Sequence, residues 1–320
     1  MIGVQQTDIP LIVVAGPTAS GKTGLAVELA LRLGGEVISA DSMQLYRDIP
    51  IQTAQPGEGE RRGIPHHLMG ILPLDASYSV ARWLEEARRL IAEIHRRGKL
   101  PIVCGGTGLY ITSLLQNRSL SGSGENPEVR RRLQERVREE GAEALLCELA
   151  VVDPETARRL SSQDLHRVIR ALELYETTGM TMSEQIAASR RVPSPYRARV
   201  LLLDCRDREQ LYRRINSRVD SMLNAGMEQE VRRVRPLLAG TARQAIGCKE
   251  LLPWIEGRCT KEEAVDNLKQ ATRRYAKRQL TWFRKTEGVR LYIDEYPEKT
   301  ALLRAALTAL EPLYEQKGGE

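Results

Sequence analysis

The sequence predicts an α/β fold, in which a parallel sheet is flanked by helices and interrupted by an all-helical insertion. Strand-like apolar runs alternate with amphipathic helical segments up to about residue 117. Residues 118–197 instead have a helical pattern and are rich in arginine, and a strand-like run follows at 200–204. We therefore expect a core of residues 1–117 and 198–320 and an inserted helical domain of residues 118–197.

The first strand–loop–helix unit contains a phosphate-binding motif. The β-branched run at 11–14 is typical of a buried parallel strand and leads into GPTASGKT, which fits GxxxxGK[ST] at every fixed position. An apolar helix follows and ends at the glycine pair 34–35. Strand, loop and helix in this order predict a sheet of the P-loop NTPase type.

The chemistry of this loop predicts a bound di- or triphosphate group and Mg²⁺. Backbone N–H groups and the helix N-terminus bind phosphate oxygens. The lysine of the motif neutralises the terminal phosphates, and the hydroxyl of Thr23 is expected to hold Mg²⁺. The residues expected to bind the phosphates are Gly16, Pro17, Thr18, Ala19, Ser20, Gly21, Lys22 and Thr23.

The second expected strand, at 36–40, is followed directly by Asp41 and Ser42. The carboxyl ends of parallel strands form the edge of the sheet that carries the chemistry, so Asp41 is expected to face the phosphate loop. The alternative is that Asp41 only caps the next turn, as aspartates commonly do. The residue pattern leaves both interpretations open.

A helix is expected at 79–97 and a third strand at 100–104. The strand ends in GGTG, residues 105–108, a loop that we expect to allow close approach of a ligand to the backbone. Between these elements, residues 47–78 are rich in proline and glycine and are expected to form a loop. Its histidines, His66 and His67, are not expected to bind metal, because no third ligand lies at a suitable spacing.

The inserted region is expected to begin with a polar linker at 119–126 and to end at the prolines of 192–195. The strand expected at 200–204 ends in Asp204. This residue either supplies the acidic group that nucleotide hydrolases place at a strand end or caps the strand, and the sequence does not decide between the two.

The last basic helix begins at a capping box, residues 260–263, and runs to about residue 285. Lysines and arginines are interleaved there with Tyr275, Trp282 and Phe283, and the second half of the helix is almost purely cationic. Phosphate contacts combined with aromatic stacking surfaces are typical of single-stranded nucleic-acid binding. The net charge of +6 agrees with a polyanionic partner, although a solvated basic surface alone would give the same total.

Five scattered cysteines without a CxxC pair favour a reducing compartment. The N-terminal residues lack a cationic leader, and the first apolar run is too short to span a membrane. We expect a cytoplasmic monomer with no membrane partner.

Eight segments, in this order, resemble those of bacterial tRNA dimethylallyltransferases, also called tRNA isopentenyltransferases. They are GPTASGKT (16–23), SADSMQLY (39–46), IPHHL (64–68), GGTGLY (105–110), RVIRALELYETTG (167–179), RVDSMLNAG (218–226), QAIGCKE (244–250) and YAKRQLTWFR (275–284). The phosphate loop alone is generic, whereas the other seven together are specific and span nearly the whole chain. The resemblance implies a P-loop kinase-like core with an added helical domain that holds the anticodon stem-loop.

The resemblance also implies the reaction, which is transfer of a dimethylallyl group from dimethylallyl diphosphate to the exocyclic amine of adenosine 37 of tRNA. By match to the family motifs, Asp41 is the general base and Thr107 lies near the reacting amine. Lys22 and Arg218 hold the diphosphate. Together with Asp41 and Thr107 they form the expected catalytic set. Two positions depart from the family pattern, because Cys248 replaces an aromatic residue and His166 replaces a Gln, Arg or Lys.

A larger set of positions matches segments of the family that contact tRNA. These are Asp41, Ser42, Met43, Gln44, Thr107, Arg130, His166, Arg167, Arg170, Gln244, Ala245, Ile246, Gly247, Cys248, Lys249, Lys277, Arg278, Gln279, Leu280, Thr281, Trp282, Phe283 and Arg284.

The sequence leaves two other functions open. A small-molecule P-loop kinase that uses ATP would explain the phosphate loop and Asp41, but it would leave GGTGLY and the basic aromatic helix unexplained. A non-enzymatic, nucleotide-gated RNA-binding module would explain the basic helix without any chemistry.

Overall fold

The computed structural model describes residues 8–118 and 126–313. Contacts within the chain divide it into two compact units, one with the residues up to Leu114 and from Pro195 onward, the other Leu115–Ser194. The limits expected for the inserted domain, 118 and 197, each lie three residues later. Residues 119–125 of the expected linker lie outside the described residues.

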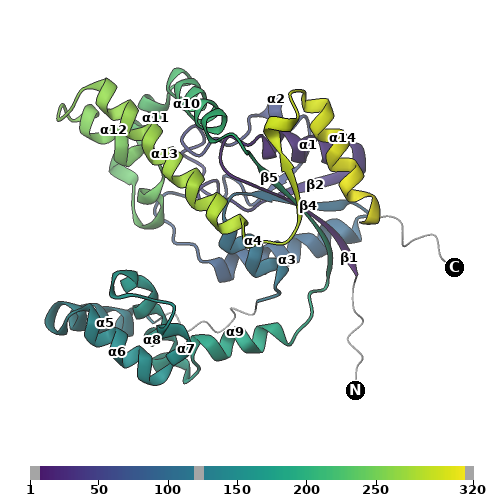
Figure 1. Cartoon of the computed structure of the whole chain (residues 1–320). Helices are drawn as coiled ribbons and strands as arrows, with labels where there is room; N and C mark the ends of the chain where they lie inside the picture. Colours follow the sequence, from purple (N-terminus) through teal and green to yellow (C-terminus); the bar gives the residue numbers. More distant parts are fainter. Residues whose placement is uncertain (1–7, 119–125, 314–320) are drawn as a thin grey trace. The chain divides into compact units, whose positions relative to one another are not determined.

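The first unit is built on a six-stranded parallel sheet with the strand order β3-β2-β4-β1-β5-β6 (Figure 1). The strands are β1 (Ile9–Ala15), β2 (Gly35–Ser39), β3 (His66–His67), β4 (Leu100–Gly105), β5 (Tyr196–Asp204) and β6 (Val289–Tyr292). The predicted α/β class with a parallel sheet is therefore confirmed.

Two edge strands differ from the sequence expectation. Residues 47–78 were expected to be loop throughout, but His66 pairs with Val37 on the free edge of β2. A two-residue strand is too short to show periodicity in a sequence, and only its pairing with β2 defines it. β6 was not predicted, and it pairs with the end of β5, where Leu203 opposes Leu291.

The helices of this unit are α1 (Lys22–Leu33), α2 (Glu58–Arg61), α3 (Val80–Arg96), α4 (Gly108–Leu115), α10 (Arg208–Asn224), α11 (Met227–Val234), α12 (Cys248–Ile255), α13 (Lys261–Phe283) and α14 (Lys299–Leu310). The three expected helices correspond closely to α1, α3 and α13, whereas α2 falls in the segment 47–78 that was expected to be loop. Ser79 caps α3 by accepting a hydrogen bond from the backbone N–H of Arg82, and Thr260 and Glu263 form the predicted capping box of α13. Among the described helices, none combines the length and the apolarity needed to cross a bilayer.

Helices cover both faces of the sheet (Figure 1). On one face α1 and α14 bury Leu29 and Leu310 against alternate residues of the strands, such as Ile12 and Leu201. On the other face α3 packs on β1, β2 and β4. Its fully buried Trp83 donates a hydrogen bond from Nε1 to the carbonyl of Ser39 (3.0 Å), which fixes the end of β2 just before the site.

Gly105, at the end of β4, allows a close contact between two strand ends. A Cβ at this position would lie 2.2 Å from the carbonyl oxygen of Ala40. The glycine-rich loop was expected to make room for a ligand, and that expectation is corrected in part. Although Gly105 also lines the cavity described below, its missing side chain admits the backbone of the neighbouring strand.

The second unit is entirely helical among its described residues. Its helices are α5 (Pro127–Glu140), α6 (Ala142–Val152), α7 (Pro154–Ala157), α8 (Leu165–Thr178) and α9 (Met182–Arg190). Leu133, Leu145, Leu149 and Leu172 form the centre of its apolar core.

A buried carboxylate of α8 ties that helix to the start of α5. The side chain of Glu173 is fully buried and accepts hydrogen bonds from Arg170 Nη1 (2.8 Å), Asn126 N (2.9 Å) and Arg130 Nη2 (3.0 Å). Burial alone would raise the pKa of Glu173, but these hydrogen bonds and the arginine charges outweigh it and hold the pKa below its ordinary value.

Replacing Glu173 with Gln should destabilise the protein in a pH-dependent way. At pH 7 the expected loss is about 1.5–3 kcal/mol, the usual worth of a hydrogen bond to a charged group. Because the folded pKa is lowered, the contribution is complete above the unfolded value of about 4.3 and disappears as the pH falls through the folded value.

Hydrogen exchange of the amides of α5 and α8, measured from pH 7 down to pH 3, checks this prediction. The difference in the free energy of unfolding between the wild type and Glu173→Gln should shrink toward the acid end of this range. The exposed Glu139→Gln should behave like the wild type throughout. A gap that stays constant with pH would show that the charge of Glu173 is not the source of its contribution.

Candidate active site

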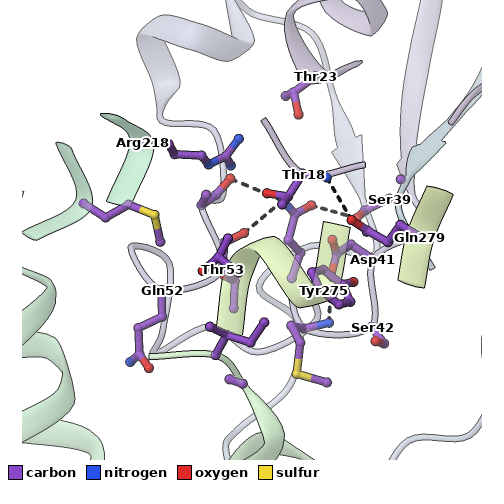
Figure 2. A pocket seen from close by; sticks show the side chains of 18 of the residues that line it. Thr18, Thr23, Ser39, Asp41, Ser42, Gln52, Thr53, Arg218, Tyr275 and Gln279 are labelled. Carbon is purple, nitrogen blue, oxygen red and sulfur yellow. Dashed lines mark hydrogen bonds between the residues drawn. The ribbon is translucent and has the colours of Figure 1, made fainter. Parts of the chain in front are cut away.

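A cavity of about 270 Å³ opens at the carboxyl edge of the sheet (Figure 2). Its walls come from the phosphate loop, the ends of β2 and β4, the loop after β2, and helices α10 and α13. Many of the predicted site residues line it. They are Thr18, Lys22, Thr23, Asp41, Ser42, Met43, Gln44, Arg218, Gln244, Ala245, Ile246, Arg278 and Gln279.

The phosphate loop curves around the N-terminus of α1 as the motif predicts. Ala19 has φ 62° and Gly21 has φ 85°, so two residues of the loop adopt left-handed backbone conformations. Arg214 of α10 holds this shape from outside, since its Nε donates to the carbonyl of Ala19 (2.9 Å). The sequence alone did not indicate this contact.

The positive charges inside the cavity are partly removed from water. Burial lowers the pKa of the Lys22 ammonium and the pKa of Arg218, and the carboxylate of Asp41 acts in the opposite direction on both. Lys22 Nζ donates a hydrogen bond to the carbonyl of Pro17 (3.2 Å). Thr23 lies on the same wall, and Figure 2 shows its hydroxyl oxygen turned toward the cavity. Such desolvated cations are typical of a site that binds an anion.

Asp41 fulfils both interpretations that the sequence left open. Its Oδ1 accepts a hydrogen bond from the backbone N–H of Met43 (3.0 Å), so it caps the turn that follows β2. The residue also lines the cavity and is only half-buried. One carboxylate oxygen thus holds the loop, while the residue still lines the cavity.

Tyr275 of α13 lies next to Asp41 in the cavity, and sequence analysis missed this role (Figure 2). Burial raises the pKa of its phenol far above the ordinary value, and the charge of Asp41 raises it further. Its hydroxyl therefore keeps its proton, and the side chain hydrogen-bonds to that of Gln279. The YAKRQ pattern could have indicated Tyr275, but its position among cations suggested a surface role.

The side chains around Asp41 bond to one another. Thr107 Oγ1 accepts from the N–H of Ser42 (3.0 Å), and Ser39 Oγ donates to Gln44 Oε1 (3.0 Å). Gln44 Nε2 in turn donates to the carbonyl of Thr53 (3.3 Å). Thr107 is not among the residues that line the cavity, so the structure gives it a contact with the loop after Asp41.

An apolar wall faces the phosphate loop and was not predicted. It is formed mainly by side chains of α10, α11 and α13. They are Val219, Met222, Met227 and Leu268.

Several residues expected to contact tRNA have side chains that are buried in this structure. Leu280 and Phe283 pack inside the first unit, and Gln279 is only 5% exposed although it lines the cavity. Cys248 is likewise buried; its Sγ donates to Gln52 Oε1 (2.9 Å), and burial raises its pKa to about 11. Charge alone does not distinguish the interior of a basic helix from its outer face, so the sequence did not indicate this burial. Contact of these residues with tRNA stays a prediction.

Other members of that set have exposed side chains, whereas Ala245 and Gly247 are also buried. On α13 and just after it Lys277, Arg278, Thr281, Trp282 and Arg284 are exposed, as is Lys249 on α12. In the second unit His166 and Arg167 are exposed, whereas Arg130 and Arg170 share the carboxylate of Glu173. Their contact with tRNA stays a prediction.

Asp204 caps its strand, which is the structural one of the two roles that the sequence left open. It accepts from the N–H of Cys205 (2.7 Å) and pairs with Arg208 and Arg290, and it does not line the cavity. His67 pairs with Glu36 (2.7 Å). The described residues contain no group of three His, Cys, Asp or Glu side chains placed to hold a metal ion.

Comparison with known proteins places this chain in a family. A family model described as IPP transferase matches residues 44–286. The chain belongs to the IPP transferase family. Proteins named tRNA dimethylallyltransferase from Acetivibrio thermocellus and Geobacillus kaustophilus are 46% and 47% identical to it. These matches cover 87% and 88% of this chain and 90% and 89% of the relatives.

Solved structures of the IPP transferase family agree with this assignment. The full-length tRNA isopentenylpyrophosphate transferase of Bacillus halodurans is 38% identical, with a TM-score of 0.69 over 98% of this chain and 100% of its own. A eukaryotic dimethylallyltransferase acting on tRNA is 33% identical, with a TM-score of 0.80 over 92% of this chain and 77% of its own. The resemblance stated from the motifs is confirmed.

Proposed function

We propose that this IPP transferase moves a dimethylallyl group from dimethylallyl diphosphate to the exocyclic N6 amine of adenosine 37 in tRNA and releases diphosphate. The observation that carries the proposal is a single cavity that joins three surfaces: the phosphate loop, an apolar wall, and Asp41. The names of the relatives support this reaction and do not support the kinase alternative.

The phosphate loop, Lys22 and Arg218 would bind the diphosphate of the donor. Both side chains hold positive charge at a cost, because burial lowers their pKa values, and a diphosphate would offset that cost. Negative charge grows on the departing oxygen in the transition state, so these contacts strengthen as the reaction proceeds.

Thr23 fits a magnesium ion held jointly with the substrate. Mg²⁺ commonly takes one or two protein oxygens together with phosphate oxygens and waters, so the lack of a three-residue acidic cluster among the described residues agrees with this mode. When bound, the ion would neutralise part of the charge of the diphosphate. The chain's own contribution is the hydroxyl of Thr23 and the neighbouring charge of Lys22.

The isoprenoid tail would lie along the apolar wall. Met222, Met227 and Leu268 offer unbranched or flexible apolar side chains there, and each buried CH₂ group of a ligand gains about 0.8 kcal/mol. These side chains line the same cavity as the phosphate loop and suit a prenyl chain better than a polar metabolite.

Asp41 would act as the general base on the adenine amine. The nitrogen attacks the allylic carbon, the carbon–oxygen bond to diphosphate breaks with its electron pair on oxygen, and the amine proton passes to the carboxylate. Because Oδ1 is held by the N–H of Met43, the carboxylate has a fixed orientation for this transfer. General base catalysis of this kind typically gives 10²–10⁴-fold in rate.

The exposed cations of α13 would bind the tRNA. Lys277, Arg278 and Arg284 provide phosphate contacts, and Trp282 is 40% exposed and available for stacking. Arg278 also lines the cavity, so the outer face of the helix leads directly to the reaction site.

A labelling experiment tests the proposed function. The purified protein is incubated with tRNA and Mg²⁺, together with either labelled dimethylallyl diphosphate or γ-labelled ATP. We expect label in the RNA from the prenyl donor only. Transfer of phosphate from ATP to a small molecule would support a kinase instead, and no transfer from either donor would support an RNA-binding module.

Replacing Asp41 with Ala should slow prenyl transfer by at least about a hundredfold and leave tRNA affinity nearly unchanged. Single-turnover rates and filter-binding affinities measure the two effects separately. Asp75→Ala, at an exposed carboxylate outside the cavity lining, makes the same charge change as a control. Near-normal turnover in Asp41→Ala would remove this residue from the base role.

Replacing Lys277 with Ala should weaken tRNA binding and lower the slope of log affinity against log salt by about one, since one phosphate contact is lost. Lys299→Ala, at the exposed start of α14, is the matched control and should leave the slope unchanged. An identical slope for Lys277→Ala and the wild type would mean that this part of α13 does not contact the RNA phosphates.

A further inference from the structure

The side chain of Gln279 connects the basic helix to the phosphate loop. Its Oε1 accepts a hydrogen bond from the backbone N–H of Thr18 (2.8 Å), and its Nε2 donates to the carbonyl of Gly106 (3.0 Å) (Figure 2). The residue is 5% exposed, and both polar atoms of its amide are engaged. The family resemblance placed Gln279 among the tRNA contacts. In this structure its amide instead joins two backbone segments of the chain itself.

The fit around this amide is tight. A Cβ on Gly106 would lie 2.1 Å from Gln279 Nε2, so a side chain at this position would displace the amide from its two hydrogen bonds. The next residue, Thr107, accepts from the N–H of Ser42 and thereby holds the turn that follows Asp41. One buried side chain therefore links α13 to the loop that binds the donor and to the loop that carries the base.

The same helix also carries exposed cations. Lys277 and Arg278, within two residues of Gln279, are exposed, and Arg278 lines the cavity as well. A helix is stiff over such a distance, so a ligand that fixes the outer face also fixes the direction of the amide on the inner face. The amide in turn sets where the N–H of Thr18 lies.

We propose that Gln279 is a positioning residue that couples RNA binding on the outer face of α13 to diphosphate binding at the phosphate loop. This inference rests on the proposed function. RNA on α13 holds the amide in place, the amide holds Thr18 and Gly106, and the loop is then shaped for the donor. Coupling between two binding sites is reciprocal, so the donor strengthens RNA binding by the same factor.

The variant Gln279→Met tests this coupling. Methionine is unbranched and similar in length, but it forms neither hydrogen bond. Calorimetry gives the dissociation constant of inorganic diphosphate with Mg²⁺, in the absence and presence of a saturating anticodon hairpin, and the reverse titration closes the cycle. In the wild type we expect the hairpin to tighten diphosphate binding by about 5–150-fold, the usual range of allosteric coupling.

In Gln279→Met this factor should fall below about two in both directions, while the affinity for the hairpin alone changes less than about threefold, since the exposed cations remain. Gln279→Glu is a second variant of nearly the same shape. It keeps the acceptor for Thr18 but loses the donor to Gly106, so its coupling should fall as well. Leu251→Met, at a buried residue of α12, which packs against α13, controls for a general loosening of the helix and should keep the wild-type factor.

Retention of the wild-type coupling factor in Gln279→Met would overturn the inference, as would a wild type that binds both ligands without coupling. Either result would leave the proposed function intact, because prenyl label in the RNA decides that separately. A wild type that neither binds the hairpin nor labels RNA would overturn both.

Discussion

The site depends on holding two cations away from water beside a single carboxylate. Lys22 and Arg218 carry their charge against the penalty of burial, which lowers both pKa values, and Asp41 supplies only part of the compensation. The surrounding structure keeps this unbalanced arrangement from relaxing. Arg214 holds the outside of the phosphate loop, Trp83 fixes the end of β2, and the missing side chain of Gly105 lets the strand ends meet. The charge that remains uncompensated is what an anionic substrate encounters.

The positive charge of the sequence is distributed less evenly than its composition suggests. In the second unit Arg130 and Arg170 share Glu173, and Arg136 pairs with Glu140 and Glu148. Such internal pairs contribute little field at a distance, because each cation is matched within a few ångströms. On α13, by contrast, the cations of the last turns are exposed and few acidic residues lie near them in sequence. The basic character of the chain is therefore most effective next to the cavity.

Sequence patterns predicted the elements whose signals are long or chemically exclusive. The phosphate loop, the face of α3 that buries Trp83, and the location of Asp41 at a strand end all follow from periodicity or motif. Gln279 could not be placed in this way, because a glutamine among lysines and arginines has no intrinsic reason to be buried. Only the approach of Gly106 and Thr18, distant in sequence, gives its amide two partners. Cys248 was misplaced for a similar reason, since its environment depends on Gln52 from another segment.

The hydrogen bonds of Ser39 and Gln44, which line the cavity, have an energetic consequence. Both side chains have a partner in the folded chain, so their rotamers are fixed when the chain folds. A nucleotide that enters the cavity consequently meets dipoles that are already oriented, and little reorganisation energy remains for the reacting complex to supply. Conformational entropy that many enzymes lose on meeting their substrate is here lost during folding, which favours fast chemistry once both reactants are in place.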